Sequence, residues 1–306
     1  MKDLYFLSGR ISSLEKKFIT YEKLKKIIDS KTFEEFINLL EDTFFKLPSH
    51  ITSSEEIFKY FENERSRLVE EIEKTFNGNL KLFFLLKYDY FNLANLILGK
   101  EIFSLYGTIN FYTLKDAFEK NDKSKVPEIL HNGFKIGRSE KPVEKKLLLL
   151  KIDYYKKLYQ IAEKISDFVK NYVKIEIDFS NLETYLNKKM FGEKLETIDL
   201  IENGNIEKES FLDEENLWKK VGSIYRKIEI PLNEENIEIE KYGRVVNYIK
   251  ESRIKPDTID KIVSFYIARE IEIDNLQRIV ISKFYKMSEE FFKKILIPPY
   301  QYREEK

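Results

Sequence analysis

Side chains able to do acid–base, nucleophilic or metal chemistry are scarce and scattered in this sequence. It contains no cysteine, so disulfides and thiolate metal ligands are excluded. Its two histidines, His50 and His131, stand far apart in the sequence, and a lone histidine in a polar loop is usually solvated rather than bound to a metal. No group of histidines and carboxylates has the spacing of metal ligands. The sequence therefore predicts neither a metal site nor a cofactor site.

Adjacent acids and isolated glycines give no better support for catalysis. The pairs Glu34-Glu35 and Glu289-Glu290 place their carboxylates on different faces of a helix, as solvated residues do. The glycines do not form a phosphate-binding loop. We therefore expect no catalytic residue and no nucleotide hydrolysis by this chain. An enzyme with an unrecognised site is the weakest of the alternatives.

A five-residue pattern occurs three times, at Asp89–Leu93, Asp178–Leu182 and Glu272–Leu276. Each copy begins with an acid and ends in Asn-Leu, and apolar residues follow the asparagine by four and five positions. A lysine follows it by eight positions. Four further Asn-Leu pairs lack the full pattern. The repeated asparagines and lysines are Asn92, Asn181 and Asn275, and Lys100, Lys189 and Lys283.

The spacing of the repeat indicates one structural unit built several times. The asparagines lie 89 and 94 residues apart (181 minus 92, and 275 minus 181), the length of a small helical domain. A chain of similar units presents a surface, so the repeat favours a scaffold. We expect three lobes, with boundaries set to within about 15 residues. The lobes comprise residues 1–84 together with 265–306, residues 85–170, and residues 171–264.

The role of the repeated residues is left open by the sequence. Asp89 and Asp178 are candidates for helix N-caps. Glu272, however, lies inside a helix expected from Thr258 to Phe284, so capping is not the shared role. A hydrogen bond from each asparagine to another helix fits all three copies. The alternative is that the copies are unrelated amphipathic helices with a buried apolar stripe.

The elements that position these residues are expected to be helices throughout. Only 10 glycines and 7 prolines interrupt long stretches with the apolar spacing of amphipathic helices, which predicts an all-α fold. Thr32 and Glu35 form a capping box. An irregular extended segment is expected over 228–239. Long helices are expected over 53–75, 80–100 with a break near Asp89, 143–174, and 258–284.

Charge and hydropathy exclude two classes of partner. The chain has 53 basic and 53 acidic residues, without the basic excess typical of nucleic-acid binding. The longest apolar runs, Leu82–Leu86 and Leu147–Leu150, fall far short of the ~20 residues that span a bilayer. The first residues lack the apolar run of a signal peptide. We expect a cytoplasmic protein that neither binds nucleic acid nor spans the membrane.

Four segments in order along the chain resemble the C subunit of the prokaryotic V/A-type rotary ATPases, a family related to the d subunit of the eukaryotic vacuolar enzyme. They are Tyr5–Ile11, Leu40–Phe44, Lys87–Lys100 and Ala268–Lys283, with weaker agreement at 152–155 and 200–206. The resemblance covers nearly the whole chain. Departures from the family pattern occur at Ser12 and Gln277, where arginine is usual, and at Asn203, where glycine is usual.

The resemblance implies a funnel-like body of three similar helical lobes with pseudo-threefold repetition. It implies a non-catalytic central-stalk subunit, a socket between the membrane rotor-ring subunits and the central-shaft subunits, on the cytoplasmic face of the membrane. Such a socket couples ATP chemistry to proton or sodium transport. The alternative function is a general helical-repeat adaptor for another helical partner.

Three arginines, Arg10, Arg269 and Arg278, are candidates for contacts with a partner, because arginine is enriched in protein interfaces. The alternative is an ordinary ion pair within the chain, worth about 0–1 kcal/mol at the surface.

Overall fold

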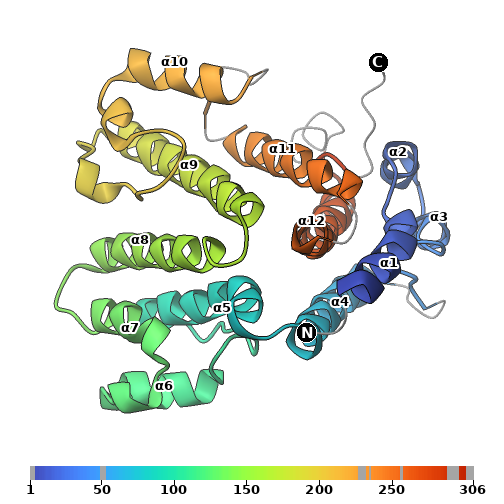
Figure 1. The fold of residues 1–306 in the computed structure, drawn as a ribbon. Coiled ribbons are helices and arrows are strands. Elements are labelled where there is room, and N and C mark those ends of the chain that lie inside the picture. Colours follow the sequence, from blue (N-terminus) through green and yellow to red (C-terminus); the bar gives the residue numbers. More distant parts are fainter. Residues whose placement is uncertain are drawn as a thin grey trace. The chain divides into compact units, whose positions relative to one another are not determined.

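The structure is a computed structural model that describes residues 4–48, 53–226, 232–233, 236–255, 258–287 and 296–300. These residues form helices and connecting loops and no strand, so the all-α prediction is confirmed. The α-helices are α1 (Leu4–Leu14), α2 (Tyr21–Asp29), α3 (Phe33–Leu39), α4 (Ser54–Thr75), α5 (Gly78–Leu98), α6 (Phe111–Lys120), α7 (His131–Gly137), α8 (Val143–Ala162), α9 (Asp167–Met190), α10 (Glu214–Ile224), α11 (Ile237–Lys250) and α12 (Ile259–Phe284). Figure 1 labels them all.

Short 3₁₀ helices complete the secondary structure of the described residues. They are η1 (Glu15–Lys17), η2 (Lys123–Lys125), η3 (Glu128–Leu130), η4 (Thr197–Asp199), η5 (Lys208–Leu212) and η6 (Glu251–Ile254).

The chain divides into two compact units. Unit 1 comprises Met1–Glu71 together with Leu232–Lys306, and unit 2 is the continuous stretch Ile72–Pro231. The boundary between residues 71 and 72 falls inside α4. The finer division into three lobes stays a prediction.

Unit 1 is built around α12, which packs against α1 and α11. Its core contains an aromatic cluster centred on Phe18, whose ring lies 5.6 Å from that of Phe265 and 4.9 Å from that of Tyr300. Phe44 lies 5.2 Å from Phe18 at an edge-to-face angle, the geometry that aromatic quadrupoles favour. Residues from both ends of the chain therefore share one core.

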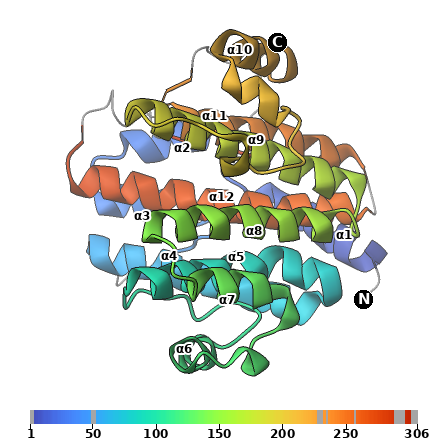
Figure 2. The same ribbon diagram turned by 90° about the vertical axis from the view of Figure 1, so that its left-hand side faces the viewer.

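Unit 2 contains a layer of three long helices, with α8 between α5 and α9 (Figures 1 and 2). Buried Asp153 on α8 joins neighbouring helices: it accepts hydrogen bonds from the hydroxyl of Tyr90 at 2.5 Å and from the amide of Asn132 at 2.7 Å. A buried carboxylate is tolerated when such donors satisfy it. The segment 152–155 of the family resemblance thus contributes a polar link within the layer.

Several predicted helix ends are confirmed. The Thr32 hydroxyl accepts from the backbone of Glu35, whose carboxylate accepts in return from Thr32, which is the expected capping box. Thr258 caps α12 by accepting from the backbone of Lys261. The helices over 54–75 and 259–284 agree with the predicted ranges.

Three expectations about the elements are wrong. α5 runs without a break through Asp89, because the carboxylate bonds to a loop and leaves the helical backbone intact. The single helix expected over 143–174 is two helices, since Ser166 starts α9 by capping the backbone of Val169. In the segment 228–239, α11 already begins at Ile237; residues 228–231 and 234–235 lie outside the described residues.

Candidate functional site

The repeated pattern lies in the middle of three long helices, α5, α9 and α12. Its leucines, Leu93, Leu182 and Leu276, have no exposed surface, as expected for a core stripe. Asp89 and Asp178 are fully buried and lie far from the helix starts at residues 78 and 167. The suggestion that these two acids cap helices is therefore wrong.

Each repeated asparagine pairs with the backbone of one residue in a loop that follows its helix. The Asn92 amide donates to the carbonyl of Ser104 at 2.9 Å and accepts from the N–H of Ser104 at 2.7 Å. Asn181 makes the same two bonds to Ile201, at 2.9 and 2.8 Å. Asn275 makes them to Ile297, at 2.9 and 3.1 Å, so one geometry recurs three times.

The expected bond from each asparagine to another helix is thus wrong in its partner: all three reach a non-helical segment. A primary amide suits the task because it carries one acceptor and adjacent donors, like a peptide group. It can therefore satisfy both backbone groups of a single buried loop residue, which would otherwise cost free energy.

In the first two copies, the acid three residues earlier holds the same loop at a second point. Asp89 accepts from the backbone and hydroxyl of Thr108, at 3.0 and 2.7 Å, and from the backbone of Ile109. Asp178 accepts from the backbone of Asn205 and of Ile206, both at 3.0 Å. We call each acid, its asparagine and the backbone they bind an acid–Asn clamp.

Glycine allows the close approach of loop and acid in the first two clamps. A Cβ added at Gly107 would lie well inside 3.0 Å of an Asp89 oxygen, and one at Gly204 would clash in the same way with Asp178. Both glycines stand two residues before the isoleucine whose N–H binds the acid. The family position at 203–204 departs from two glycines, but it keeps the one that the carboxylate requires.

The third clamp is assembled from both ends of unit 1. Glu272 accepts from the backbone N–H of Ile19 at 2.6 Å, while Asn275 binds Ile297. Lys17 stands where the other clamps have glycine. Glutamate is one methylene longer than aspartate, so its carboxyl reaches the backbone from further away.

Burial raises the pKa of all three acids above the usual range. The pKa of Asp89 rises to about 6 because burial penalises its charged form, against the opposing effect of the bonds from Thr108 and Ile109. Burial likewise raises the pKa of Asp178. The pKa of Glu272 rises to about 8 through burial, which outweighs the Ile19 bond and the charge of Arg269.

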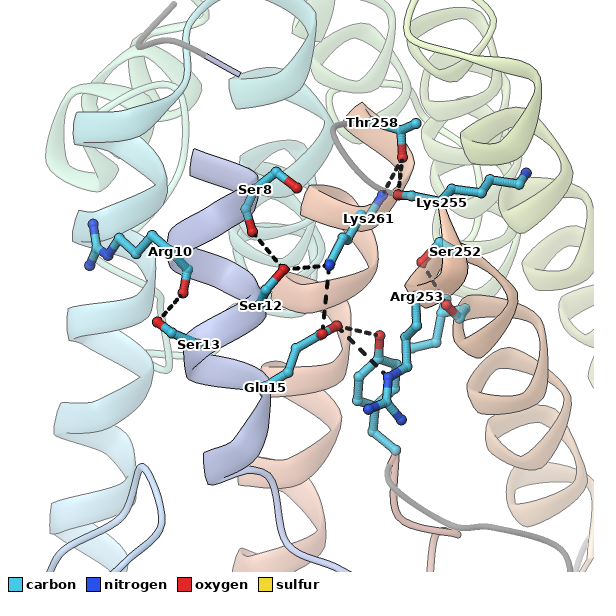
Figure 3. Close-up of polar contacts among 12 residues, drawn as sticks. Ser8, Arg10, Ser12, Ser13, Glu15, Ser252, Arg253, Lys255, Thr258 and Lys261 are labelled. Carbon is cyan, nitrogen blue, oxygen red and sulfur yellow. Dashed lines mark hydrogen bonds and ion pairs between the residues drawn. The ribbon is translucent and has the colours of Figure 1, made fainter. Parts of the chain in front are cut away.

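A second polar cluster joins the two chain ends of unit 1, as Figure 3 shows. Buried Lys261, near the start of α12, donates to the hydroxyl of Ser12 at 2.7 Å and lies 3.8 Å from the carboxylate of Glu15. Arg253 lies 3.9 Å from the same carboxylate, which also accepts from the Tyr300 hydroxyl at 3.3 Å. At Ser12, where the family usually has arginine, Lys261 brings the cation from another helix.

The three arginines predicted as partner contacts all form ion pairs within unit 1. Arg10 is exposed and lies 3.2 Å from Glu71. Arg269 is buried, 3.6 Å from the same glutamate, with its guanidinium 4.4 Å from the centre of the Phe44 ring. Arg278 lies 2.5 Å from Glu238. Their contact with a partner stays a prediction.

The repeated lysines do not share one role. Lys283 is half-buried and donates to the carbonyls of Ile28 and Ser30 at the end of α2, where a cation complements the helix dipole. Lys189 pairs with Glu214 at 2.5 Å, whereas Lys100 is exposed.

Nothing in the described part of the chain resembles a metal centre. Groups of three or more histidines and acids placed to hold a metal ion do not occur there. His131 is half-buried and donates to the carbonyl of Val126 at 2.8 Å; His50 lies outside the described residues. Nor is any helix in that part long and apolar enough to cross a membrane.

Two surface pockets lie in unit 2, of about 500 and 650 Å³. The first is bordered by Ile152 and Ile198, and the second by Lys194 and Leu212. None of the three clamp acids lines either pocket. The three clamp acids, whose pKa values burial raises, therefore bind backbone groups and do not line these pockets.

Comparisons with known proteins agree on one family. The model of the family described as "ATP synthase (C/AC39) subunit" matches residues 7–295, a range that contains all three clamp helices. The chain is 27% identical to the C subunit of the A-type ATP synthase of Desulfurococcus sp. (strain SY), over 89% of this chain and 84% of that protein. It is 25% identical to the protein of the same name from Pyrococcus horikoshii, over 83% of this chain and 72% of that protein.

Proposed function

The chain belongs to the ATP synthase (C/AC39) subunit family, and we propose that it is a non-catalytic central-stalk subunit of a V-type ATPase or ATP synthase. In this role it is a socket that couples the membrane rotor-ring subunits to the central-shaft subunits during ATP-linked proton or sodium transport. It lies at the cytoplasmic face of the membrane, held there by the complex. The family match over residues 7–295 is the observation that carries the proposal.

The use of the buried acids supports a mechanical rather than a catalytic role. Asp89, Asp178 and Glu272 each bind backbone of their own chain, and none of them lines either of the two surface pockets of unit 2. Carboxylates with perturbed pKa values often mark active sites, but structural networks shift pKa values as well. Here the hydrogen bonds account for Asp89 and Asp178 without any substrate.

The clamps suit a part that transmits torque. Close-packed helices resist deformation. The first two clamps each fasten a loop to the helix before it at two points, and the third fastens two separate segments to α12. Every clamp lies wholly within one predicted lobe, since the partners of Asn92, Asn181 and Asn275 fall in 85–170, in 171–264, and in 1–84 with 265–306. This agreement supports three similar lobes, which would offer a shaft several equivalent faces.

A pull-down from detergent-solubilised membranes tests the proposed function. The tagged full-length chain, expressed in its own organism, is expected to retain both rotor-ring and shaft subunits through the wash. Tagged chain added after solubilisation is the control for adventitious capture. Recovery of an unrelated helical protein without ring and shaft subunits would favour the adaptor function and contradict the proposal.

Coupling is tested in the reconstituted complex. Without this chain, the complex is expected to hydrolyse ATP but to transport no ions, because shaft and ring no longer turn together. Adding the chain back is expected to restore transport. Transport at the normal rate without the chain would contradict the socket role.

A further inference from the structure

The acid of the third clamp differs from the other two in how its oxygens are satisfied. Both oxygens of Asp89 accept hydrogen bonds, and so do both oxygens of Asp178. Glu272 receives one bond, from the backbone of Ile19 to Oε1 at 2.6 Å. Its Oε2 atom is buried without a hydrogen-bond partner. The three clamps thus provide an internal comparison in which one carboxyl lacks the donors that a buried charge needs.

The surroundings of Glu272 do not compensate for the missing donors. It lines a space of about 10 Å³, about the size that admits one water molecule, which is bordered by α12, Ile19 and the segment Pro298–Tyr300. The other lining side chains are apolar or are engaged in the asparagine pair, except for Tyr300, whose hydroxyl donates to Glu15. The several water molecules that would hydrate a carboxylate do not fit in this space.

The cation that acts on this carboxyl is already paired. Arg269 lies on α12, one turn before Glu272, and its charge favours the ionised form of the Glu272 carboxyl. Its guanidinium, however, lies 3.6 Å from Glu71 and 4.0 Å from Glu64 on α4. Among the described elements packed against the carboxyl, the charged and titratable groups are therefore Arg269 with its two glutamates, and Tyr300 with Glu15.

We propose that Glu272 is a proton-controlled latch: its neutral carboxyl holds the backbone of Ile19 in the core, and loss of the proton opens the segment Phe18–Thr20 to water. The neutral acid accepts the bond from Ile19 at Oε1, and the small space that Glu272 lines admits the one water that its own O–H needs as an acceptor. The charged form needs further hydrogen-bond donors, and the structure can provide these donors only by letting water reach Oε2. The latch is a property of unit 1 and does not depend on the proposed function.

The working range of the latch follows from the pKa of Glu272, which burial raises to about 8. With this value the ionised fraction rises from about one tenth to about nine tenths between pH 7 and pH 9, one unit on each side. Asp89, with a pKa of about 6, is largely ionised throughout that range. The backbone N–H of Ile109, held by Asp89, is therefore an internal reference for that of Ile19.

Amide hydrogen exchange of the full-length chain between pH 7 and pH 9 tests the proposal. The protection of Ile19 relative to Ile109 is expected to fall about tenfold, in proportion to the ionised fraction of Glu272. Glu272→Gln keeps an acceptor for Ile19 and cannot ionise. In this variant the protection of Ile19 relative to that of Ile109 is therefore expected to stay constant with pH. Glu22→Gln, an exposed site on α2, is the matched control and is expected to behave like the wild type.

A second measurement decides the matter if Glu272→Gln does not fold. The carboxyl ¹³C resonance of Glu272 in the labelled wild-type chain is expected to titrate with a midpoint above pH 7. A midpoint at or below pH 7 would overturn the latch. A constant ratio between the protection of Ile19 and that of Ile109 from pH 7 to pH 9 in the wild type would overturn it as well.

Discussion

Asn181 and Ile201 form a closed pair of hydrogen bonds: the side-chain amide of one donates to the carbonyl and accepts from the N–H of the other, at 2.9 and 2.8 Å. The side-chain amide of the asparagine takes the place of a backbone peptide group. It pairs with a loop residue that has no neighbouring strand to bind. Both partners are buried, so neither backbone group can turn to water instead. Two further asparagines repeat the arrangement.

Asn181→Asp is expected to destabilise unit 2 by about 2–4 kcal/mol, because it sets a carboxylate oxygen against the carbonyl of Ile201 and leaves a buried acceptor unpaired. Urea unfolding followed by the fluorescence of Trp218, the single tryptophan, measures the loss. Trp218 reports on the right region, since its ring lies 6.0 Å from that of Tyr185 on α9. Asn187→Asp, an exposed site on the same helix, is the control and is expected to change stability little. Equal midpoints for the two variants would show that the pair contributes nothing.

Gly204→Ala is expected to lower stability by about 1–3 kcal/mol, the usual cost of overpacking, since its Cβ would overlap an oxygen of Asp178. Thermal unfolding by circular dichroism measures the effect. Gly9→Ala is the matched control: nothing lies within 4 Å of its Cβ in α1, so alanine there is expected to leave stability unchanged or raise it. A Gly204→Ala protein as stable as the wild type would mean that the loop can move away from the acid at no cost.

Leu276→Asp is expected to destabilise unit 1 strongly, by more than about 3 kcal/mol, because Leu276 has no exposed surface and an isolated charge there has no partner. Ile281→Asp serves as the control on the same helix, since Ile281 is 37% exposed. The measurement is chemical unfolding followed by circular dichroism. Similar midpoints for the two variants would contradict the core assignment of the repeat.

Arg278→Ala separates the two roles open to this arginine. Its pair with Glu238 is partly exposed, so the isolated chain is expected to lose no more than about 1 kcal/mol. If Arg278 also binds a protein of the complex, the variant is expected to retain less of that complex in the pull-down. Glu238→Ala breaks the same ion pair but keeps the arginine, and is expected to retain the complex. Equal retention by both variants would count against the contact.

Asp89 is expected to make unit 2 less stable as the pH rises from about 4 to about 6. Its pKa is 3.8 in an ordinary setting and about 6 in the fold, so the folded state holds the proton more tightly than the unfolded state. Its contribution to stability is therefore present below pH 4 and is lost as the pH passes through 6. The shift of about two units corresponds to about 3 kcal/mol. The difference in unfolding free energy between wild type and Asp89→Asn, measured across pH 4–7, is expected to change by that order, and a constant difference would disprove it.

Sequence reasoning located the clamp helices but not what they bind. The acids and asparagines were visible because side-chain identity recurs at fixed spacing. Their partners use backbone atoms, which any residue type supplies, and Ser104, Ile201 and Ile297 follow their asparagines at unequal distances of 12, 20 and 22 residues. The signal that remained was a glycine two residues before an isoleucine, at Gly107 and Gly204.

Helix boundaries were missed where no glycine or proline marks them. The break between α8 and α9 falls at residues 163–166, and a single hydroxyl, that of Ser166, caps the new helix. A lone serine is too common to predict a break. Asp89 misleads in the opposite way: a polar residue in an apolar run predicts an interruption of the helix, although its partners lie in the loop after α5.

The discontinuous third clamp fixes an order in biosynthesis. Both clamps of unit 2 lie within one uninterrupted stretch, so this unit has all its parts as soon as residue 231 leaves the ribosome. Ile19 cannot form its hydrogen bond until Glu272 has been synthesised. Domains fold as units during translation, so the inserted unit matures first, while the apolar residues around Phe18 stay exposed and in need of protection until α12 emerges.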